Sequence, residues 1–347
     1  MKHFVLFVVV VFLGLFLAVL NRTDQAGESN SAKTLRVFGY ASFTGRWGPG
    51  PVLKEKFEKN CKCKVEFIDG SDSGILLQRL KIEGESLGAD VVVGLDQFDL
   101  QKATSEQQWR KLNLAQLDVY ESVKPALANS FFVPYDWGAL TFIARKGEIS
   151  ELPKKLDDLL DPAYARKIGL EDPRTSSPGM QFIYWVLQSK GEEEGFKYLK
   201  KMMAQVHSYS PTWSTAYGLF TSHQTELVFS YVTSPLYQQI EEKKNDYLAI
   251  SFEEPLPVQY EFVGIPDFCR QCDLAEKFIN LMLSPEGQKI LMEKNYMLPV
   301  MKGIKEKSSA FAQLPEYPTL NKFETPSTTE VDRILKHWSE IRRGELD

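Results

Sequence analysis

The 347-residue sequence has few of the side chains on which enzyme active sites are usually built. It contains four histidines and four cysteines. It shows no H-E-x-x-H zinc motif and no phosphate-binding P-loop. His207 and His223 flank an aromatic segment, and we expect both on the surface. The sequence therefore predicts a protein that is not an enzyme and has no catalytic residue, no metal site and no cofactor.

An excess of charge of one sign is also missing. Lys and Arg together number 41 and Asp and Glu 46, which gives a net charge of −5. This weakly acidic balance argues against nucleic acid as a partner. No internal repeat and no low-complexity tract is visible. The length and the 43% hydrophobic content are those of an ordinary globular protein with room for two lobes.

The few cysteines lie in two short sequence motifs, Cys61 with Cys63 and Cys269 with Cys272. In an oxidising compartment an even number of cysteines indicates disulfides, and three pairings are possible. Local pairs would close very small loops and stabilise the fold little. A zinc site formed by all four thiolates is the alternative.

The first 21 residues predict a secretory signal. Lys2 and His3 precede an unbroken apolar run from Phe4 to Leu20. We expect cleavage, with residues 22–33 as a flexible leader. An uncleaved anchor is the alternative, because the run is near the lower limit of about 17 residues for a membrane span. Both outcomes place the body of the protein outside the cytoplasm, either free or tethered to the membrane, and the absence of a cysteine before Cys61 argues against a lipoprotein anchor.

Alternation of strands and helices predicts an α/β fold. Strands are expected at 35–40, 64–68 and 89–95, with a helix over 71–85 before the third strand. Strands that alternate with helices form parallel sheets with right-handed crossovers. Further helices are expected at 154–160, 178–190, 192–205, 274–283, 286–294 and 330–343.

Two long β-prone runs, 131–145 and 258–265, are long enough to pass between lobes. Two such crossings predict a hinged clamshell. Lobe 1 would be discontinuous, formed by residues 34–136 and 262–347, and lobe 2 would span 137–261. Each lobe would contain a mostly parallel sheet flanked by helices.

The most informative stretch is 209–238, YSPTWSTAYGLFTSHQTELVFSYVTSPLYQ. Residues 226–231 predict a strand, and polar groups and rings at the end of such a strand lie where open α/β sheets bind ligands. Single aromatic residues are usually part of a core. Several aromatic residues that lie among serines and threonines in one segment favour a binding cleft instead. The aromatic side chains concerned are Trp213, Tyr217, Phe220, Tyr231 and Tyr237.

A helix start near residue 178 is the second candidate for a ligand contact. We expect Ser177 as the N-cap and Pro178 in the first turn. With Ser176 and Gly179, the free backbone N–H groups of this turn would suit an anionic or hydroxyl group of a ligand. A capped helix without a ligand is the alternative.

Further candidates follow the first strands. Tyr40 and Trp47 would close over a flat ligand. Asp72, Asp96 and Asp136 each lie at a helix start or a strand end, where an isolated Asp is usually a cap or a turn residue. For a cationic ligand, one of these carboxylates would be the counter-charge.

These segments, in order, resemble the periplasmic thiamine-binding proteins of thiamine ABC transporters, which are type II solute-binding proteins. The resemblance extends from Leu35 to about Trp338. It is carried by WGPGP (47–51), CKC (61–63), ADVV (89–92), VPYD (133–136), DPRTS (172–176), WSTAYGLF (213–220) and SYVTSP (230–235). It implies a monomeric two-lobe receptor that delivers thiamine, or thiamine mono- and pyrophosphate, to a membrane permease.

The resemblance also implies roles for individual residues. Two departures from the family pattern touch the ligand region: Tyr296 stands where a Trp is usual, and Ala41 where an Asp is usual. Ser176 and its neighbours would face the hydroxyethyl or phosphate end of the ligand. The first lobe would contribute Tyr40 and Trp47, and the second lobe would cover the rings with Trp213, Tyr231, Ser234 and Tyr237.

Three other functions stay open from the sequence. A related receptor for ferric or another cation would use paired tyrosines such as Tyr231 and Tyr237. An enzyme resembling thiaminase I would need a free cysteine as its nucleophile. A structural envelope protein has only the uncleaved anchor in its favour.

Overall fold

The computed structural model describes residues 32–112, 117–320 and 323–345. The predicted signal, 1–21, lies outside the described residues, as does nearly all of the leader. Residues Thr34–Asp347 form one compact unit, which contains all of the described helices and strands. Among the described residues, no helix is both long enough and apolar enough to cross a membrane.

The strands join in one sheet with the order β2-β1-β3-β9-β4-β7-β5-β6, and the short strands β8 and β10 pair with β4. Their bounds are β1 (Thr34–Gly39), β2 (Lys64–Asp69), β3 (Val91–Asp96), β4 (Phe132–Arg145), β5 (Ile168–Glu171), β6 (Val206–Ser210), β7 (Leu227–Tyr231), β8 (Tyr247–Ala249), β9 (Val258–Gly264) and β10 (Leu298–Pro299).

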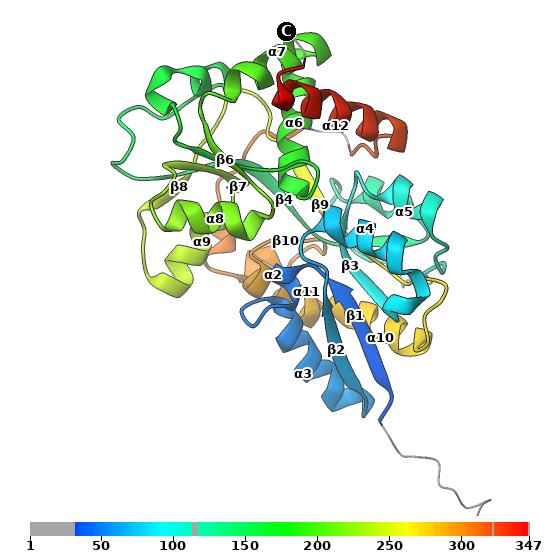
Figure 1. Ribbon diagram of the computed structural model, residues 1–347. Helices are drawn as coiled ribbons and strands as arrows, with labels where there is room; N and C mark the ends of the chain where they lie inside the picture. Colours follow the sequence, from blue (N-terminus) through cyan, green and yellow to red (C-terminus); the bar gives the residue numbers. More distant parts are fainter. Residues whose placement is uncertain (1–31, 113–116, 321–322, 346–347) are drawn as a thin grey trace, which may run out of the picture. The chain divides into compact units, whose positions relative to one another are not determined.

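Helices flank both halves of this sheet (Figure 1). The α-helices are α2 (Ala41–Thr44), α3 (Pro49–Cys61), α4 (Ser73–Glu83), α5 (Leu100–Glu106), α6 (Ser177–Lys190), α7 (Glu192–Met202), α8 (Trp213–Thr221), α9 (Ser234–Tyr237), α10 (Cys272–Met282), α11 (Pro285–Asn295) and α12 (Thr328–Arg343). Shorter helical segments are η1 (Gly84–Leu87), η2 (Lys124–Ala128), η3 (Leu156–Leu160), η4 (Pro162–Tyr164), η5 (Gln238–Glu242), η6 (Lys305–Lys307) and η7 (Phe311–Gln313).

Each half of the sheet has a parallel part. In the first lobe β1 pairs in parallel with β2 and β3. All six residues of β3 are buried, as expected for a strand covered on both faces. In the second lobe β5 pairs in parallel with β6 and β7. The α/β clamshell architecture predicted from the sequence is therefore correct.

Strand β4 connects the two halves. Its first part, Phe132–Ala139, pairs antiparallel with β9, whereas Leu140–Ala144 pair with β7. Strand β9 also pairs with β3, so the two strands lie side by side where the lobes meet. The two long β-prone runs are thus confirmed as strands, and both pass the hinge region between the lobes.

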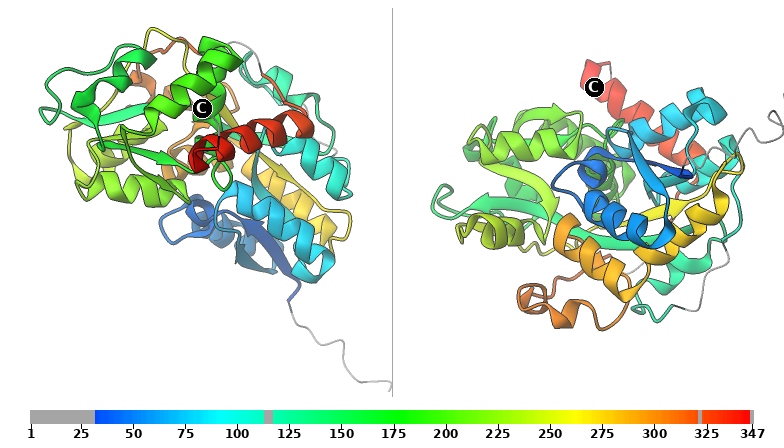
Figure 2. Two further views of the ribbon diagram at one scale, coloured as in Figure 1. Left: turned by 45° about the horizontal axis from the view of Figure 1, so that its top comes forward. Right: turned by 90° about the horizontal axis from the view of Figure 1, so that it is seen from below.

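Each lobe has its own apolar core. The first core contains residues from 35 to 135 together with residues from 260 to 300. The second core contains residues from 139 to 256 together with Phe98 and, from α12, Ile334, Trp338 and Ile341. Figure 2 shows α12 in red beside the green α6 and α7. Our assignment of α12 to lobe 1 was therefore wrong, because the apolar side chains of α12 at positions i, i+4 and i+7 pack on the second lobe.

The four cysteines form two local disulfides, Cys61–Cys63 and Cys269–Cys272. The Cα atoms are 5.2 Å apart in the first pair and 5.4 Å apart in the second. The first links the end of α3 to the segment before β2, and the second lies at the start of α10. All four thiols are thereby used, which excludes the alternative zinc site in the oxidised protein.

Candidate functional site

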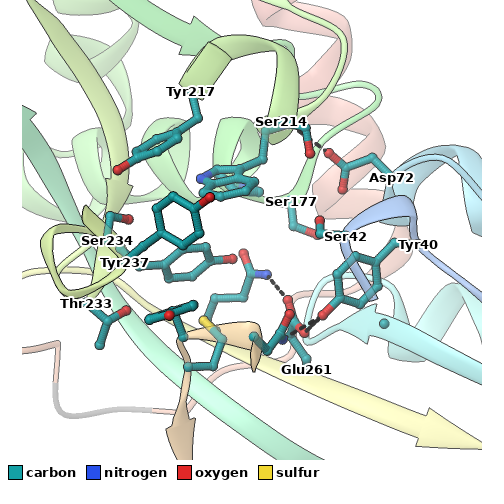
Figure 3. A pocket seen from close by; sticks show the side chains of 18 of the residues that line it. Tyr40, Ser42, Asp72, Ser177, Ser214, Tyr217, Thr233, Ser234, Tyr237 and Glu261 are labelled. Atoms are coloured by element: carbon teal, nitrogen blue, oxygen red, sulfur yellow. Dashed lines mark hydrogen bonds between the residues drawn. The ribbon is translucent and has the colours of Figure 1, made fainter. Parts of the chain in front are cut away.

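A cavity of about 350 Å³ lies between the lobes. Both lobes line it, as Figure 3 shows for the labelled side chains. Of the predicted ligand residues, Ser176 is buried beside the cavity without lining it. The structure brings the others together on its walls: Tyr40, Trp47, Asp72, Ser177, Trp213, Tyr217, Tyr231, Ser234, Tyr237 and Tyr296. Their contact with a ligand stays a prediction.

Helix α8 carries the aromatic wall of the second lobe, and we did not predict this helix. Thr212 caps it by accepting a hydrogen bond from the backbone N–H of Thr215 at 3.1 Å. Trp213 and Tyr217, at i and i+4, therefore lie on one face of the helix. Their rings stack with centroids 5.0 Å apart and an angle of 17° between the planes. The helix thus presents a broad flat aromatic surface to the cavity.

Hydrogen bonds fix this wall from behind. The indole Nε1–H of Trp213 donates to Ser230 Oγ at 2.8 Å, and Ser230 Oγ is 2.8 Å from Ser234 Oγ. The Tyr217 hydroxyl donates to Gln238 Oε1 at 2.9 Å. The polar edges of both rings are already satisfied and one face of each ring is covered by the other, so the outer face of the stacked pair remains for a ligand. The Ser and Thr residues of this segment therefore orient the rings.

A second aromatic pair spans the two lobes on the other side of the cavity. Tyr237 of α9 and Tyr296 meet edge to face, with ring centroids 5.4 Å apart. The Tyr296 hydroxyl donates to Glu241 Oε1 at 2.9 Å. Tyr296 also ends α11 in the left-handed conformation, with φ of 55°. The tyrosine that departs from the family pattern thus joins the lobes through its hydroxyl.

Trp47 stands at the mouth of the cavity. It precedes α3, whose first turn contains Pro49 and Pro51. Its side chain lines the cavity yet is 54% exposed, which is unusual for so large an apolar group. The position suits an aromatic side chain that covers a ligand after it has entered.

The turn before α6 differs by one residue from the prediction. Ser176, not Ser177, is the N-cap. Ser177 is the first residue of the helix, and its hydroxyl lies in the cavity, where it contacts the Ser73 hydroxyl of the first lobe. Ser177 is therefore placed to meet a ligand, while Ser176 is buried and does not line the cavity.

Asp72 is the N-cap of α4 and links the two lobes. One carboxylate oxygen accepts from the backbone N–H of Ser73 at 2.9 Å, and the other accepts from the backbone N–H of Trp213 at 3.0 Å. Burial raises the pKa of Asp72 from 3.8 to about 6, although both N–H groups favour the charged form. At neutral pH a charged carboxylate is thus held where α4 and α8 begin.

We expect this carboxylate to lower stability as the pH rises. Because the pKa is higher in the folded state, burial costs nothing below about pH 4, and the cost is complete above pH 6. The full cost is roughly 2–3 kcal/mol. Between pH 4.5 and 7.5 the free energy of unfolding of the wild type should therefore fall relative to that of Asp72→Asn. Urea unfolding of both ligand-free proteins measures this, and a pH-independent difference would contradict it.

Glu261 of β9 is the residue that sequence reasoning missed. It lines the cavity and is 7% exposed. Its Oε2 accepts from the hydroxyls of Tyr40 at 2.6 Å and Tyr135 at 2.8 Å, and its Oε1 from the Gln259 amide at 3.2 Å. In the sequence, Gln259 and Glu261 alternate with apolar residues in a predicted strand, so two polar groups on one face were the available signal.

Glu261 lies between two other carboxyl groups. Asp96 of β3 and Asp136 of β4 are its partners across the neighbouring strands. Burial, and secondly the charge of Glu261, raises the pKa of Asp136 well above 3.8. Burial also raises the pKa of Asp96, to about 6. Neither Asp lines the cavity, so of the three aspartates considered as a counter-charge Asp72 is the one that the structure places on its wall.

Hydrogen bonds distinguish Glu261 from its neighbour Asp136. Burial raises the pKa of Glu261 too, but several hydrogen bonds to its oxygens stabilise the charged form. Asp136 accepts one hydrogen bond, from the Asn295 amide at 2.8 Å. Of these two carboxyls, Glu261 is therefore the more readily ionised. Glu261 thus gives the cavity a carboxyl group that is stabilised as an anion by its hydrogen bonds.

The arrangement can bind a flat cation. Aromatic faces attract a desolvated cation by about 0.5–2 kcal/mol each, and Asp72 and Glu261 supply negative charge. Within residues 32–112, 117–320 and 323–345, no group of three or more His, Cys, Asp or Glu side chains is placed to hold a metal ion. The cavity therefore has the chemistry of a site for an organic cation.

Known proteins that are similar to this chain are solute-binding proteins. Residues 53–319 match the family model for bacterial extracellular solute-binding proteins. The thiamine-binding periplasmic protein of Brucella suis is 36% identical over 291 residues, which cover 84% of this chain and 86% of that protein. The protein of the same name from Salmonella typhimurium is 37% identical over 275 residues, 79% and 83% of the two chains.

A solved structure agrees with the sequence relatives. A periplasmic thiamin-binding protein superposes with a TM-score of 0.81 at 32% identity, covering 89% of this chain and 96% of the other. The shared sequence extends over the lobes and the cavity described above. The chain therefore belongs to the bacterial extracellular solute-binding proteins and, within them, to the family of thiamine-binding periplasmic proteins.

Proposed function

We infer that this protein is an extracytoplasmic receptor that binds thiamine between its lobes and delivers it to the permease of an ABC transporter. The observation that carries the inference is a cavity lined both by the rings of Trp213, Tyr217 and Tyr237 from the second lobe and by the carboxylates of Asp72 and Glu261. Thiamine has a flat aminopyrimidine and a cationic thiazolium ring. The aromatic faces suit the two rings, and the carboxylates suit the charge.

Closure of the lobes would report that the site is filled. The hydrogen bond from Trp213 N to Asp72 and the one from Tyr296 to Glu241 both join the lobes. A ligand that contacts both walls favours the closed form by its differential affinity. The permease would recognise this closed form. A monomer suffices for this function, because one chain supplies both walls.

Calorimetric titration with thiamine tests the receptor function. The protein should first be unfolded and refolded to remove carried-over ligand. We expect tight one-to-one binding. Failure to bind thiamine, with metal-dependent visible absorbance on adding ferric ion, would favour an iron receptor that uses Tyr231 and Tyr237 instead.

The cysteine pairs support a receptor over a thiamine-cleaving enzyme. Such an enzyme needs a free thiolate, and all four cysteines of the chain are in disulfides. None of them lines the cavity. Thiol titration of the native protein should find no reactive group, and thiamine incubated with the protein should remain intact.

Tyr237→Ala should weaken thiamine binding by roughly 10- to 100-fold. The ring lines the cavity and contacts Tyr296 of the other lobe. The change removes a stacking face of about 1–3 kcal/mol. Tyr237→Phe is the matched control, because it keeps the face and removes only the hydroxyl, and it should stay within about threefold of the wild type. Equal loss in both variants would assign the effect to the hydroxyl.

A further inference from the structure

At the side of the cavity that Tyr296 lines, one carboxylate joins the two lobes without lining the cavity itself. This carboxylate belongs to Glu241 of the second lobe, whereas Lys294 and Tyr296 of the first lobe are both on the cavity wall. The Tyr296 hydroxyl donates to Glu241 Oε1 at 2.9 Å, and Lys294 Nζ is 3.6 Å from the same oxygen. A single oxygen of the second lobe therefore contacts two side chains of the first.

The segment that carries this carboxylate packs against the first lobe. Its apolar side chains Leu236 and Ile240 belong to one apolar cluster with Met292 of α11 and with Phe311. Leu236 and Phe311 are both buried in this cluster. Apolar contacts between the lobes therefore hold the carboxylate near its two partners.

The same segment is also bound to the aromatic wall of the second lobe. Gln238 is buried, and its Oε1 accepts the hydrogen bond from the Tyr217 hydroxyl at 2.9 Å. Gln238 begins the π-helical turn η5, a rare conformation that is often found at functional sites. A ligand on the aromatic wall thus lies on a surface that is fixed to the segment contacting the first lobe.

The backbone of Tyr296 is in an uncommon conformation that suits its contact with the second lobe. Its φ of 55° is in the left-handed region, which residues other than glycine rarely adopt. Such a conformation persists where the surrounding contacts hold it. The Tyr296 ring stacks on Phe311 with centroids 6.3 Å apart and meets Tyr237 edge to face. Its hydroxyl is therefore directed to Glu241 while its ring lines the cavity.

The contacts of Glu241 must break before the lobes can separate on this side of the cavity. A ligand enclosed between two lobes leaves after the cleft has opened. Hydrogen bonds to a charged acceptor are stronger than those between neutral groups. The side chains of Glu241 and Lys294 are each 44% exposed, so water can replace these contacts when the lobes part. The arrangement is that of a closure that can open and form again.

We infer that Glu241 is a latch, which holds the lobes closed through Tyr296 and Lys294 and sets the rate at which bound thiamine dissociates. This inference rests on the proposed function. Because Glu241 does not line the cavity, it is a positioning residue that acts through these two side chains. Loss of the latch shortens the lifetime of the complex and leaves the ligand's own contacts in place.

The test measures thiamine dissociation from the full chain by stopped-flow fluorescence. Trp47 and Trp213 line the cavity, so tryptophan emission reports the bound state. Tyr296→Phe keeps the ring and removes the hydroxyl, and Glu241→Ala removes the carboxylate. Each variant should release thiamine about 3- to 30-fold faster than the wild type. The double variant should be no more than about twofold faster than the faster single variant, because both changes remove the same contact.

Glu293→Gln is the matched control. It removes a carboxylate from α11, close to Tyr296 in sequence, whose ion pair with Lys289 lies within one helix at 3.8 Å. An exposed ion pair of this kind contributes little, so the dissociation rate should stay within about twofold of the wild type. Glu241 is exposed and Tyr296→Phe keeps the packed ring, so all of the variants should fold.

The outcomes separate the latch from the receptor function. Failure to bind thiamine would overturn the proposed function and the inference with it. Thiamine that binds, yet leaves both single variants at the wild-type rate, would overturn the latch alone. Faster release from Tyr296→Phe but not from Glu241→Ala would show that the hydroxyl contacts the ligand directly. Faster release from Glu241→Ala alone, or additive effects in the double variant, would show that the two side chains act independently, and each of these results also overturns the latch.

Discussion

Trp213→Ala is expected to weaken thiamine binding by roughly 30- to 1000-fold. Trp213 stacks on Tyr217, and its Nε1–H is already bound to Ser230, so its open face is available to the ligand. Loss of the indole removes about 1–3 kcal/mol of stacking with a flat ring. It also removes roughly 0.5–2 kcal/mol of attraction for the cation. The two losses together come to about 1.5–5 kcal/mol, and with about 1.4 kcal/mol for each factor of ten the middle of this interval gives the expected range.

Trp213→Phe is the control for this prediction. It keeps an aromatic face and loses the hydrogen bond to Ser230, so the loss of affinity should stay below about tenfold. Trp213 is only partly buried, and its contact with Asp72 is made by the backbone. Both variants should therefore unfold within about 1–2 kcal/mol of the wild type. Unchanged affinity in both Trp213→Ala and Tyr237→Ala would remove the aromatic-cleft model.

The sequence predicts the second-lobe wall well because aromatic residues gather in one segment. It could not show how Trp213 and Tyr217 are arranged, since α8 contains Gly218 and two threonines and lacks a clear helical signal. The cap at Thr212 and the i, i+4 spacing of the rings were the local signs. The hydrogen bond between Asp72 and Trp213 joins residues 141 positions apart, and no local pattern encodes such a contact.

The first-lobe wall was predicted less well for a different reason. Asp96 and Asp136 stand out in the sequence because they end strand-like runs, but in the sheet they lie beside Glu261, buried away from the cavity. Glu261 itself lies inside a β-prone run that we interpreted only as a hinge crossing. Which of three neighbouring carboxyls faces the cavity depends on the register of β3, β9 and β4, and register is a property of the assembled sheet.

The assembled first-lobe wall leads to the second large effect, that of Glu261→Gln. We expect this variant to bind thiamine roughly 10- to 100-fold more weakly, because it removes a buried charge opposite the cation. A close charge pair near a protein surface contributes up to about 4 kcal/mol, and part of this is offset because the carboxylate must lose water. The amide oxygen that the substitution introduces can still accept hydrogen bonds from Tyr40 and Tyr135, so the wall should keep its shape.

Two comparisons isolate the charge. A neutral analogue, with an uncharged ring in place of the thiazolium, should bind the wild type and Glu261→Gln with similar affinity, because neither complex then contains the ion pair. Glu171→Gln is the matched control. Burial raises the pKa of Glu171, and this buried side chain does not line the cavity, so its replacement leaves the walls that meet the ligand unchanged. Thiamine affinity should then stay within about threefold of the wild type. If Glu171→Gln and Glu261→Gln weaken thiamine binding equally, the effect comes from disturbed packing, and the charge of Glu261 is not what holds the cation.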